Sequence, residues 1–587
     1  MIDPIGVPKG SIEPKLSSMK FIQTFWTRPA SNIHSMDIKG GWLFSESHWM
    51  SWALSCLQTR KFYGEIELVT DNRGKEILID LLGLPYYSVT TELEGKLDNY
   101  PPQLWSLAKI YTYSIQREPF LHLDGDLFLW NQFDEKIMKA PIVAQNLELN
   151  LAYYRNILES IDIHFPFMPD VLRTACHQEH DINASNTGIF GGHNLSFIGQ
   201  YCKNAFSFVD KNLEIISTLK NSAINFIFEQ CLLYYDAKAA GQPITYLMDK
   251  PVTDPSYMGY ARFLDIPSVN MLHTLGGYKI LPSTATHLSK RLRKEYPDYY
   301  YRILEICQQQ QIALRNKVYE YPPFSIPGFF KTLEKSENIT DPFQRPAIIS
   351  AHAGSVLPGY SINYQTAYNR TLAALKHIQQ LTSENPDPAL SMGGDMIDKI
   401  QDQLNAIAPD NKERVEEIFR LESKKVQLAG CFQDLGSIQE NYLKDIRNYR
   451  QAEEIFNQRT DQIMATKIGL GDQVCIFDLS CSWNLYEFTD SLELFIKKKL
   501  KAESSLEQVA LVPDWTLLTI DEIYLDHLEM IIVAICADEM TIKSALDEIK
   551  PFLDPNERAG GTEDPEKMIL DALRRLLYAG ILEVSIK

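Results

Sequence analysis

The sequence has few of the features that define membrane, secreted or nucleic-acid-binding proteins. No apolar run approaches the ~20 residues that a membrane-spanning helix needs, and the first residues lack the charged-then-apolar pattern of a secretory signal. Lys and Arg number 57 against 76 Asp and Glu, which gives a formal net charge of −19. General nucleic-acid binding and polybasic membrane binding both need an excess of cations. These absences predict a cytoplasmic protein with no membrane span and no nucleic-acid partner.

Closely spaced cysteines are also missing. The nine cysteines are scattered along the chain, and none forms a C-x-x-C pair. An odd, dispersed set is typical of reduced thiols in a cytosolic protein and not of a disulfide framework. Structural zinc is disfavoured for the same reason.

A chain of 587 residues is too long for one hydrophobic core, so two to four domains are expected. Residues 1–18 are rich in Pro, Gly and Ser and are predicted to be flexible. Residues 19–330 alternate β-rich and helical runs, residues 331–505 are dominated by long polar helices, and residues 506–587 form a small unit with a winged-helix-like α+β outline. We therefore predict an α/β domain, a mainly helical domain and a small C-terminal domain.

The first domain shows the pattern of a doubly wound sheet. Residues 20–26, 64–70 and 120–123 read as strands, and residues 43–57 and 75–82 read as helices. Alternation of strands with helices predicts a mostly parallel sheet covered on both faces. Ligands of such sheets bind at the carboxyl ends of the strands, where Asp71 and Asp124 are expected to lie.

The first motif with chemical meaning is HLDGD at residues 122–126. An apolar strand delivers Asp124 and Asp126 into a turn, where alternate side chains can face the same way. Gly125 allows a tight turn and a close approach of a ligand. Two carboxylates on a divalent ion, whose remaining positions are open to phosphate oxygens, suit a nucleotide-diphosphate site. The alternative is a surface Asp-Gly turn without function.

The second motif is HTLGGYK at residues 273–279, with the spacing H-x-x-G-x-x-K. His273 could complete the metal shell with a neutral imidazole. Gly276 would let the backbone approach a diphosphate, and Lys279 would place a cation near the leaving phosphate. The alternative is a capped turn with a satisfied histidine and a solvated lysine.

Together these motifs resemble the retaining nucleotide-sugar glycosyltransferases of the GT-A fold, specifically the glycogenin-like and bacterial galactosyltransferase-like family. Asn186 and Gly188, in ASNTGIFGG at residues 184–192, are similar to the N-x-G segment of that family, which faces the sugar and the acceptor. Glu229 and Gln230 stand where the family usually has Asp-Gln. The resemblance covers residues 20–281 and implies a GT-A-like fold for the first domain.

Two departures from the family pattern occur within this region. Glu229 replaces the usual Asp, which leaves its role open. The lysine of the second motif is followed by Ile280 and Leu281, where the family usually has Pro-Trp.

The resemblance also implies roles for individual side chains. Asp124, Asp126 and His273 would bind Mn²⁺ or Mg²⁺. Lys279 and the backbone at Gly125 and Gly276 would hold the diphosphate. The other implied roles are donor binding by Asp71 and Lys109, catalysis in the sugar pocket by Glu229 and Gln230 together with Lys279, and sugar or acceptor binding by Asn186 and Gly188. Lys109 could equally be a solvated helix lysine.

The apolar pattern of the last domain, from residue 524 to residue 582, resembles small winged-helix modules that bind leader peptides during ribosomal peptide modification. Its elements are predicted as helices at residues 524–537, 542–552 and 565–578 and a strand at residues 581–586. If the resemblance holds, the acceptor is a peptide. A plain packing domain is the alternative.

The sequence therefore predicts a metal-dependent hexosyltransferase. It would move a sugar from a nucleotide donor, expected to be a UDP-sugar, to a peptide, protein or glycan acceptor, and the resemblance implies retention of configuration. One alternative is a non-catalytic peptide-binding or scaffold protein that keeps a degenerate glycosyltransferase fold. Another is a nucleotidyl- or phosphotransferase that uses the same carboxylates. The sequence leaves the sugar, the acceptor and the oligomeric state open.

Overall fold

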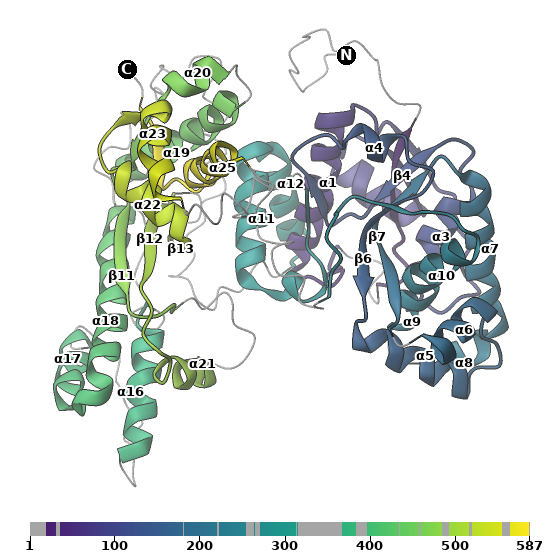
Figure 1. The fold of residues 1–587 in the computed structure, drawn as a ribbon, viewed down its shortest axis with the longest axis horizontal. Coiled ribbons are helices and arrows are strands. Elements are labelled where there is room, and N and C mark those ends of the chain that lie inside the picture. The colour runs from purple at the N-terminus through teal and green to yellow at the C-terminus, as the bar shows by residue number, and fades with distance from the viewer. Residues whose placement is uncertain are drawn as a thin grey trace. The chain divides into compact units, whose positions relative to one another are not determined.

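The chain divides into two compact units that are described separately below (Figure 1). The computed structural model describes residues 19–30, 36–179, 181–219, 222–253, 263, 271–312, 314, 367–382, 396–433, 435–456, 460–483, 492–515, 519–553 and 564–585. The first unit comprises Met1–Ala261 and Asn270–Tyr278, and the second comprises Arg262–Val269 and Lys279–Lys587. The segment predicted to be flexible, residues 1–18, and the predicted boundary at residue 330 lie outside the described residues. The predicted four-part division remains a proposal.

The first unit is built on a seven-stranded sheet with the order β3-β2-β1-β4-β7-β6-β8. Strands β1, β2, β3 and β4 are parallel neighbours, β7 is antiparallel to β4 and β6, and β8 is parallel to β6. The strands are β1 (Lys20–Phe25), β2 (Glu67–Thr70), β3 (Ser88–Thr90), β4 (Phe120–Leu123), β6 (Val143–Leu149), β7 (Asn183–Gly192) and β8 (Thr245–Tyr246). The expected mostly parallel sheet is confirmed.

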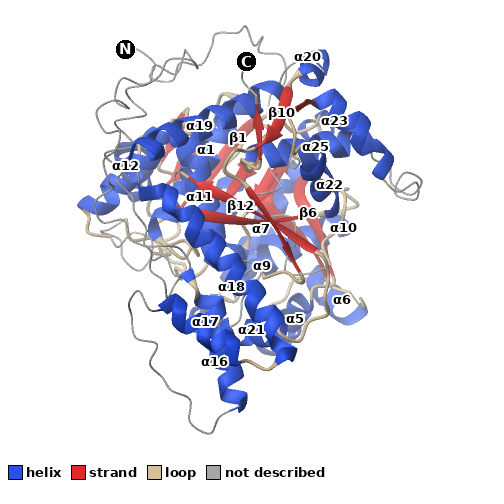
Figure 2. Cartoon of the chain, turned by 90° about the vertical axis from the view of Figure 1, so that its left-hand side faces the viewer, coloured by secondary structure: helices blue, strands red, loops and turns tan. Residues whose placement is uncertain are grey.

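Helices alternate with these strands along the chain (Figure 2). Helix α1 is followed by Gly64 in a left-handed conformation, with φ of 78°, which glycine adopts without strain. The helices are α1 (Ser45–Tyr63), α2 (Asn72–Lys75), α3 (Leu107–Ser114), α4 (Glu135–Met138), α5 (Ala152–His164), α6 (Asp170–Gln178), α7 (Leu195–Lys211), α8 (Leu213–Thr218), α9 (Ile224–Phe226) and α10 (Leu232–Ala239), with π-helical turns η1 (Glu76–Leu81) and η2 (Ile227–Cys231).

Strand β1 shows that both faces of the sheet are covered. Successive side chains of a strand point to opposite faces. Phe21 stacks on Tyr63 of α1 at a centroid distance of 3.8 Å, and Phe25 meets Trp52 of α1 at 4.9 Å. Ile22, between them, belongs to the core that α3, α5, α7 and α10 build on the other face. Helices therefore lie on both faces, as expected for a doubly wound, GT-A-like sheet.

Strand pairing brings the chemically interesting segments to one edge of this sheet. Strand β4 ends at Leu123, which pairs with Ile189 of the antiparallel β7. The next amide, that of Asp124, donates to the carbonyl of Gly188 at 3.0 Å. On the other side of β7, Asn146 of β6 pairs with Asn186. The end of β4 and the middle of β6 and β7 are thus neighbours.

The second unit begins with helices. These are α11 (Pro282–Glu295), α12 (Pro297–Gln309), α16 (Asn369–Thr382), α17 (Met396–Ala406), α18 (Pro409–Ala429), α19 (Leu435–Phe456), α20 (Thr460–Ala465) and α21 (Leu492–Lys499), with a 3₁₀ turn η5 (Gly430–Gln433). A buried ion cluster holds α16 to its neighbours, because Arg370 pairs with Glu422 of α18 at 3.0 Å and with Glu522 at 2.7 Å. The long helices predicted for this region are present.

Two small antiparallel sheets and three helices complete the second unit. The sheets have the orders β11-β12-β13 and β14-β10-β15. Their strands are β10 (Lys467–Leu470), β11 (Cys475–Leu479), β12 (Glu507–Asp514), β13 (Thr519–Leu525), β14 (Met540–Thr541) and β15 (Leu582–Val584), and the helices are α22 (His527–Ile535), α23 (Ile542–Ile549) and α25 (Pro565–Tyr578), with a 3₁₀ turn η7 (Lys550–Phe552). The resemblance to winged-helix modules remains a prediction.

One predicted helix of this region is wrong at its start. Tyr524 was placed in a helix over residues 524–537, but the structure puts Tyr524 in β13 and begins α22 at His527. Asp526 is the reason, since its carboxylate caps the helix and Glu529 completes a capping box, which fixes a helix start.

Among the residues that the structure describes, none of the helices is both long and apolar enough to cross a membrane.

Candidate functional site

The turn after β4 carries the two aspartates of the first motif. All four residues of β4 are buried, and Asp124-Gly125-Asp126 follow at its carboxyl end before the short strand β5 (Leu127–Leu129). A Cβ atom at Gly125 would lie 2.6 Å from the Trp52 ring of α1. Glycine is therefore required here because a side chain would overlap the Trp52 ring, whether or not a ligand also approaches this turn.

Helix α1 holds the backbone of this turn. Ser51 donates to the carbonyl of Gly125 at 2.8 Å, and Ser55 donates to the carbonyl of Leu127 at 2.6 Å. These serines are one helical turn apart and face the same side. They satisfy carbonyl groups that would otherwise lack partners in a buried turn, and so they fix where both aspartates point.

Strand β9 (Met271–His273) delivers the histidine of the second motif. It pairs antiparallel with β5, so that His273 lies opposite Leu127. The backbone amide and the hydroxyl of Thr274 both donate to the carbonyl of Asp126, at 3.1 and 3.0 Å. This ribbon brings residues almost 150 positions apart in the sequence side by side.

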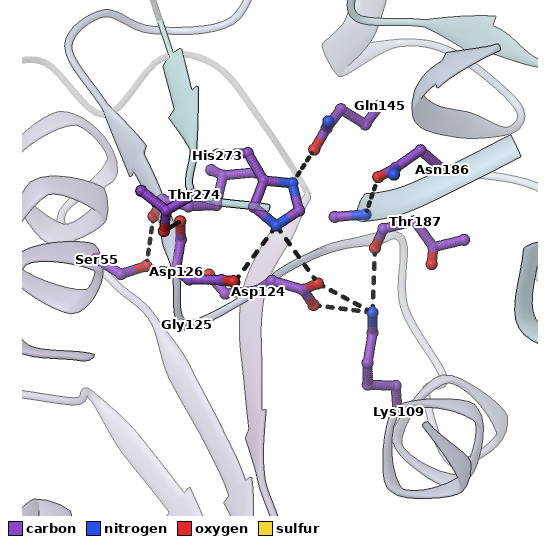
Figure 3. A network of polar contacts seen from close by, with 12 residues as sticks. Ser55, Lys109, Asp124, Gly125, Asp126, Gln145, Asn186, Thr187, His273 and Thr274 are labelled. Carbon is purple, nitrogen blue, oxygen red and sulfur yellow. Dashed lines mark hydrogen bonds and ion pairs between the residues drawn. The ribbon is translucent and has the colours of Figure 1, made fainter. Parts of the chain in front are cut away.

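Asp124, Asp126 and His273 converge on one point (Figure 3). Each offers a ligand atom, and these atoms all lie within 4.8 Å of one another. The Nε2 atom of His273 is 3.4 Å from Oδ1 of Asp126 and 4.0 Å from Oδ2 of Asp124. Among the described residues no second group of three or more such side chains was found. The geometry therefore matches the predicted set of metal ligands, Asp124, Asp126 and His273.

Hydrogen bonds to Gln145 fix the orientation of the imidazole. Gln145 donates through Nε2 to Oδ1 of Asn146 at 3.1 Å, so its Oε1 is the atom that faces Nδ1 of His273 at 2.6 Å. Nδ1 therefore carries a proton, because an amide oxygen can only accept. The other ring nitrogen, Nε2, then faces the two carboxylates, where a cation would be within reach of all three side chains.

The cluster therefore fits a divalent metal ion. Carboxylate oxygens are the ligands that Mn²⁺ and Mg²⁺ prefer, and a neutral imidazole with an oriented second nitrogen is a common further ligand. The three side chains leave coordination positions for other oxygen ligands.

Lys109 extends the cluster into the interior. Its Nζ lies 2.9 Å from Oδ1 of Asp124 and 2.5 Å from Oε1 of Glu229, and Thr187 donates to the same glutamate oxygen at 2.7 Å. The predicted alternative of a solvated helix lysine is wrong, because Lys109 is only 7% exposed. A lysine on α3 thus ties the first aspartate to η2.

Burial and pairing shift the proton affinities in this group. Burial disfavours the ammonium of Lys109, but the carboxylates of Asp124 and Glu229 more than compensate, so its pKa is raised. Burial raises the pKa of the Glu229 carboxyl, and Lys109 opposes that rise. The second oxygen of Glu229, Oε2, is buried without a hydrogen-bond partner. Such an unsatisfied atom in a buried site is unusual and marks a place for a ligand or water.

Gly188 has a different role from the predicted one. A Cβ atom at this position would lie 2.4 Å from Nδ1 of His273 and 2.3 Å from Oε1 of Gln145. The absence of a side chain therefore admits the imidazole and its amide partner. Binding of sugar or acceptor by Gly188 stays a prediction.

Asn186 on β7 and Gln230 on η2 each make polar contacts within the first unit. Asn186 donates to Oε1 of Glu148 at 3.1 Å and accepts from the amide of Gly188 at 3.0 Å. The Oε1 atom of Gln230 lies 2.7 Å from the hydroxyl of Tyr154. Their predicted places near the sugar or the acceptor are not tested by these contacts.

Asp71 lies at the carboxyl end of β2, as predicted, and both oxygens of its carboxylate accept hydrogen bonds from residues of the first unit. Oδ2 accepts from the amide and the hydroxyl of Thr27 at 2.9 and 2.8 Å, and Oδ1 accepts from the amide of Gly74 at 2.7 Å. The side chain caps α2 and fixes the loop after β1. A role in donor binding remains a prediction.

Gly276 and Lys279 form the 3₁₀ turn η4 (Gly276–Ile280) after β9. Gly276 has φ of +41° and no atom within 4 Å of a would-be Cβ, so its positive φ favours glycine. Lys279 is the first residue of the long second segment of the other compact unit, and its role with the diphosphate stays a prediction.

Sequence reasoning missed the polar residues of β6. Gln145, Asn146 and Glu148 are buried in a strand whose other members are all apolar. Polar side chains in a buried strand must find partners, and this pattern was a usable indication of a site. The serines of α1 gave no comparable indication, because serine is common on helices of every kind.

Comparisons with known proteins give one family model and similar solved structures. Residues 19–306 match a protein-family model described as a family of unknown function (DUF6734). No curated protein matches the sequence. Similar solved structures include mouse xyloside xylosyltransferase 1 in its apo form, at 11% identity and a TM-score of 0.22, with 39% of this chain and 84% of that chain covered. Another is the glycosyltransferase GlyE of Streptococcus pneumoniae TIGR4, at 11% identity and a TM-score of 0.21, with 52% of this chain and 68% of that chain covered.

Proposed function

We propose that the first unit is a metal-dependent glycosyltransferase. It would move a sugar from a nucleotide donor, a UDP-sugar, to a peptide, protein or glycan acceptor with retention of configuration. The observation that carries the proposal is the convergence of Asp124, Asp126 and His273 within 4.8 Å at the carboxyl end of β4. Three ligands from two distant motifs meet there, at the edge of a doubly wound sheet where ligands bind.

The chemistry asks for stabilisation of a leaving group and of an oxocarbenium-like transition state. A divalent ion held by Asp124, Asp126 and His273, Mn²⁺ or Mg²⁺, would supply positive charge to the diphosphate as it leaves. Lys279 would add a cation on the phosphate side. Preorganised charges of this kind lower the barrier because they act on charge that develops in the transition state.

Glu229 and Lys109 shape the sugar side of the same site. Lys109 holds one oxygen of Glu229 and both oxygens of Asp124 within 3.1 Å, so it links the metal ligands to the proposed sugar pocket. The unpartnered Oε2 of Glu229 is a hydrogen-bond acceptor suited to a sugar hydroxyl. We propose front-face transfer, in which the acceptor oxygen attacks from the side that the diphosphate leaves.

The acceptor class is proposed from the second unit. Helices α22, α23 and α25 with strand β15 follow the pattern that resembles leader-peptide-binding modules. A peptide acceptor recruited there would explain why a transferase carries such a module. A scaffold that lost turnover would have no need to keep three ligands and their oriented histidine, and this geometry favours the enzyme over that alternative.

The decisive experiment measures sugar transfer with defined donors. Purified protein is incubated with Mn²⁺ and a panel of UDP-sugars, with and without a chelator, and released UDP and sugar are quantified. Asp126→Asn should lose the metal-dependent release, while the matched control Asp249→Asn should keep it, since Asp249 is a surface carboxylate with an 88% exposed side chain. Absence of metal-dependent turnover with every donor would favour the scaffold. Release of nucleoside monophosphate without free sugar would favour a nucleotidyltransferase.

A further inference from the structure

Glu148 is a carboxylate in the core of the first unit that neither the motifs nor the metal cluster use. It lies on β6 and is 1% exposed. Oε2 accepts from the hydroxyls of Tyr153 at 3.1 Å and Tyr154 at 2.5 Å, and Oε1 accepts from Nδ2 of Asn186 at 3.1 Å. A buried carboxylate is costly unless several donors satisfy it. Glu148 therefore acts as the acceptor at the centre of a network.

Tyr154 connects this carboxyl group to a second amide. Its hydroxyl lies 2.5 Å from Oε2 of Glu148 and 2.7 Å from Oε1 of Gln230. A phenolic hydroxyl can both donate and accept, so one side chain holds Glu148 and Gln230 at fixed positions relative to each other.

The same carboxylate also fixes the amide of Asn186. Asn186 donates to Glu148 through Nδ2 and accepts from the backbone amide of Gly188 through Oδ1. Its orientation is defined at both ends. Gly188 in turn lies directly against the ring of His273, so a continuous chain of contacts runs from Glu148 to a metal ligand.

We propose that Glu148 is a positioning residue that orients Asn186 directly and Gln230 through Tyr154, and so defines which hydroxyl groups of the sugar or acceptor the site accepts. This inference rests on the proposed function. Asn186 comes from β7 and Gln230 from η2, and Glu148 contacts the first amide directly and the second through the hydroxyl of Tyr154. Glu148 thus orients both side-chain amides and decides which of their atoms, the donor or the acceptor, faces the proposed sugar site. An apolar residue at position 148 could not orient them, because it makes no hydrogen bonds.

The alternative is that Glu148 only stabilises the fold. The two readings differ in what they change. A structural role lowers the affinities for metal, nucleotide and sugar together, in step with the loss of folded protein. A positioning role leaves Mn²⁺ and UDP binding intact and changes only the steps that involve the sugar or the acceptor hydroxyl.

The test compares Glu148→Gln and Tyr154→Phe, singly and combined, with wild type. Glu179→Gln is the matched control, because Glu179 also accepts from a tyrosine hydroxyl, that of Tyr235 at 3.2 Å, and from Lys238. Melting temperature, Mn²⁺ and UDP affinities by calorimetry, and kcat and KM over the UDP-sugar panel are measured for each. We expect Glu148→Gln to lose ~10–100-fold in kcat/KM, the range found for outer partners of active-site groups. Preference among sugars should narrow or change, while Mn²⁺ and UDP affinities stay within about twofold and the double variant is no worse than Glu148→Gln.

Two outcomes would overturn the proposal: a folded Glu148→Gln protein with wild-type kcat/KM and sugar preference, or a parallel loss of metal, nucleotide and sugar affinity. A crystal structure of Glu148→Gln provides a readout that does not depend on turnover. Rotated amides at Asn186 or Gln230 support the positioning role, and unchanged amides refute it. If the wild-type protein turns over no donor, the proposed function fails, and this structural comparison still decides whether Glu148 orients the two amides.

Discussion

Gly188→Ala tests whether His273 can reach its position in the metal cluster only because residue 188 has no side chain. The added methyl group would lie 2.4 Å from Cε1 and Nδ1 of His273 and 2.3 Å from Oε1 of Gln145, whereas ordinary contacts begin at 3.4 Å. The imidazole must therefore move by about 1 Å, since ordinary side-chain packing does not tolerate such overlap. Misplacement by ~1 Å of a group at the reacting centre costs ~10²-fold in rate.

The expected result is a folded protein with weak metal binding. We expect Mn²⁺ affinity to fall ~10–100-fold, as when the partner of a metal-bound histidine is lost, and metal-dependent turnover to fall ~100-fold. Overpacking should also lower the free energy of unfolding by about 1–3 kcal/mol. Calorimetric Mn²⁺ titration, initial rates of UDP release and urea denaturation measure the three effects.

The matched control is Gly199→Ala. Gly199 lies in α7 of the same unit, and a Cβ there has no atom within 4 Å. Alanine should stabilise that helix by about 0.5–1 kcal/mol and leave Mn²⁺ binding unchanged. If Gly188→Ala is folded and binds Mn²⁺ as tightly as wild type, then the position of the imidazole does not depend on Gly188, and the steric argument is refuted.

Three further variants probe the metal, the internal lysine and the pH response. His273→Ala should lose Mn²⁺ binding and turnover while the melting temperature of the metal-free protein stays near that of wild type, and a large stability loss would mean that the ring is structural. Lys109→Met should lower the free energy of unfolding by about 3–5 kcal/mol in urea, because it leaves buried Glu229 without its cation; a loss below about 1 kcal/mol would show that the ion pair is not essential. Burial raises the pKa of Asp236 to about 6 from 3.8, so the folded state binds its proton more tightly and stability falls as pH rises between these values. Asp236→Asn removes this loss, and we expect it to gain about 2 kcal/mol relative to wild type at pH 7.5 compared with pH 4.5; equal effects at both pH values would contradict the assignment.

Local sequence patterns were sufficient for the parts of the site that lie on strand ends. Strand β4 was predicted at its observed bounds, because a short run of three apolar residues and one histidine is followed by Asp124-Gly125-Asp126. The pairing of those aspartates with His273 followed from two motifs that a known family combines, and not from any local property. Their convergence within 4.8 Å needs the β5–β9 ribbon, which short strands of three residues each did not reveal.

Other parts depended on tertiary structure that no local pattern encodes. Helix α1 is buried from Ser45 to Thr59 on all sides, so its polar residues do not follow the amphipathic period by which a surface helix is recognised. Residues 524–525 were assigned to a helix because their apolar spacing continues that of α22. Strand β13 pairs there with β12, and pairing with a strand distant in sequence overrides a local preference.

The polar face of α1 and the polar residues of β6 have one physical explanation. Ser51 and Ser55 hold the carbonyls of the aspartate turn from one side, while Gln145 holds the imidazole of His273 from the other. The ligands are therefore oriented by hydrogen bonds that are complete before any metal arrives. Preorganisation of this kind removes the cost of ordering ligands at the moment of binding and favours ions that accept the existing spacing. The polar residues of these buried elements thus determine the geometry of the site. Apolar residues at the same positions could not replace them, because they could not make these hydrogen bonds.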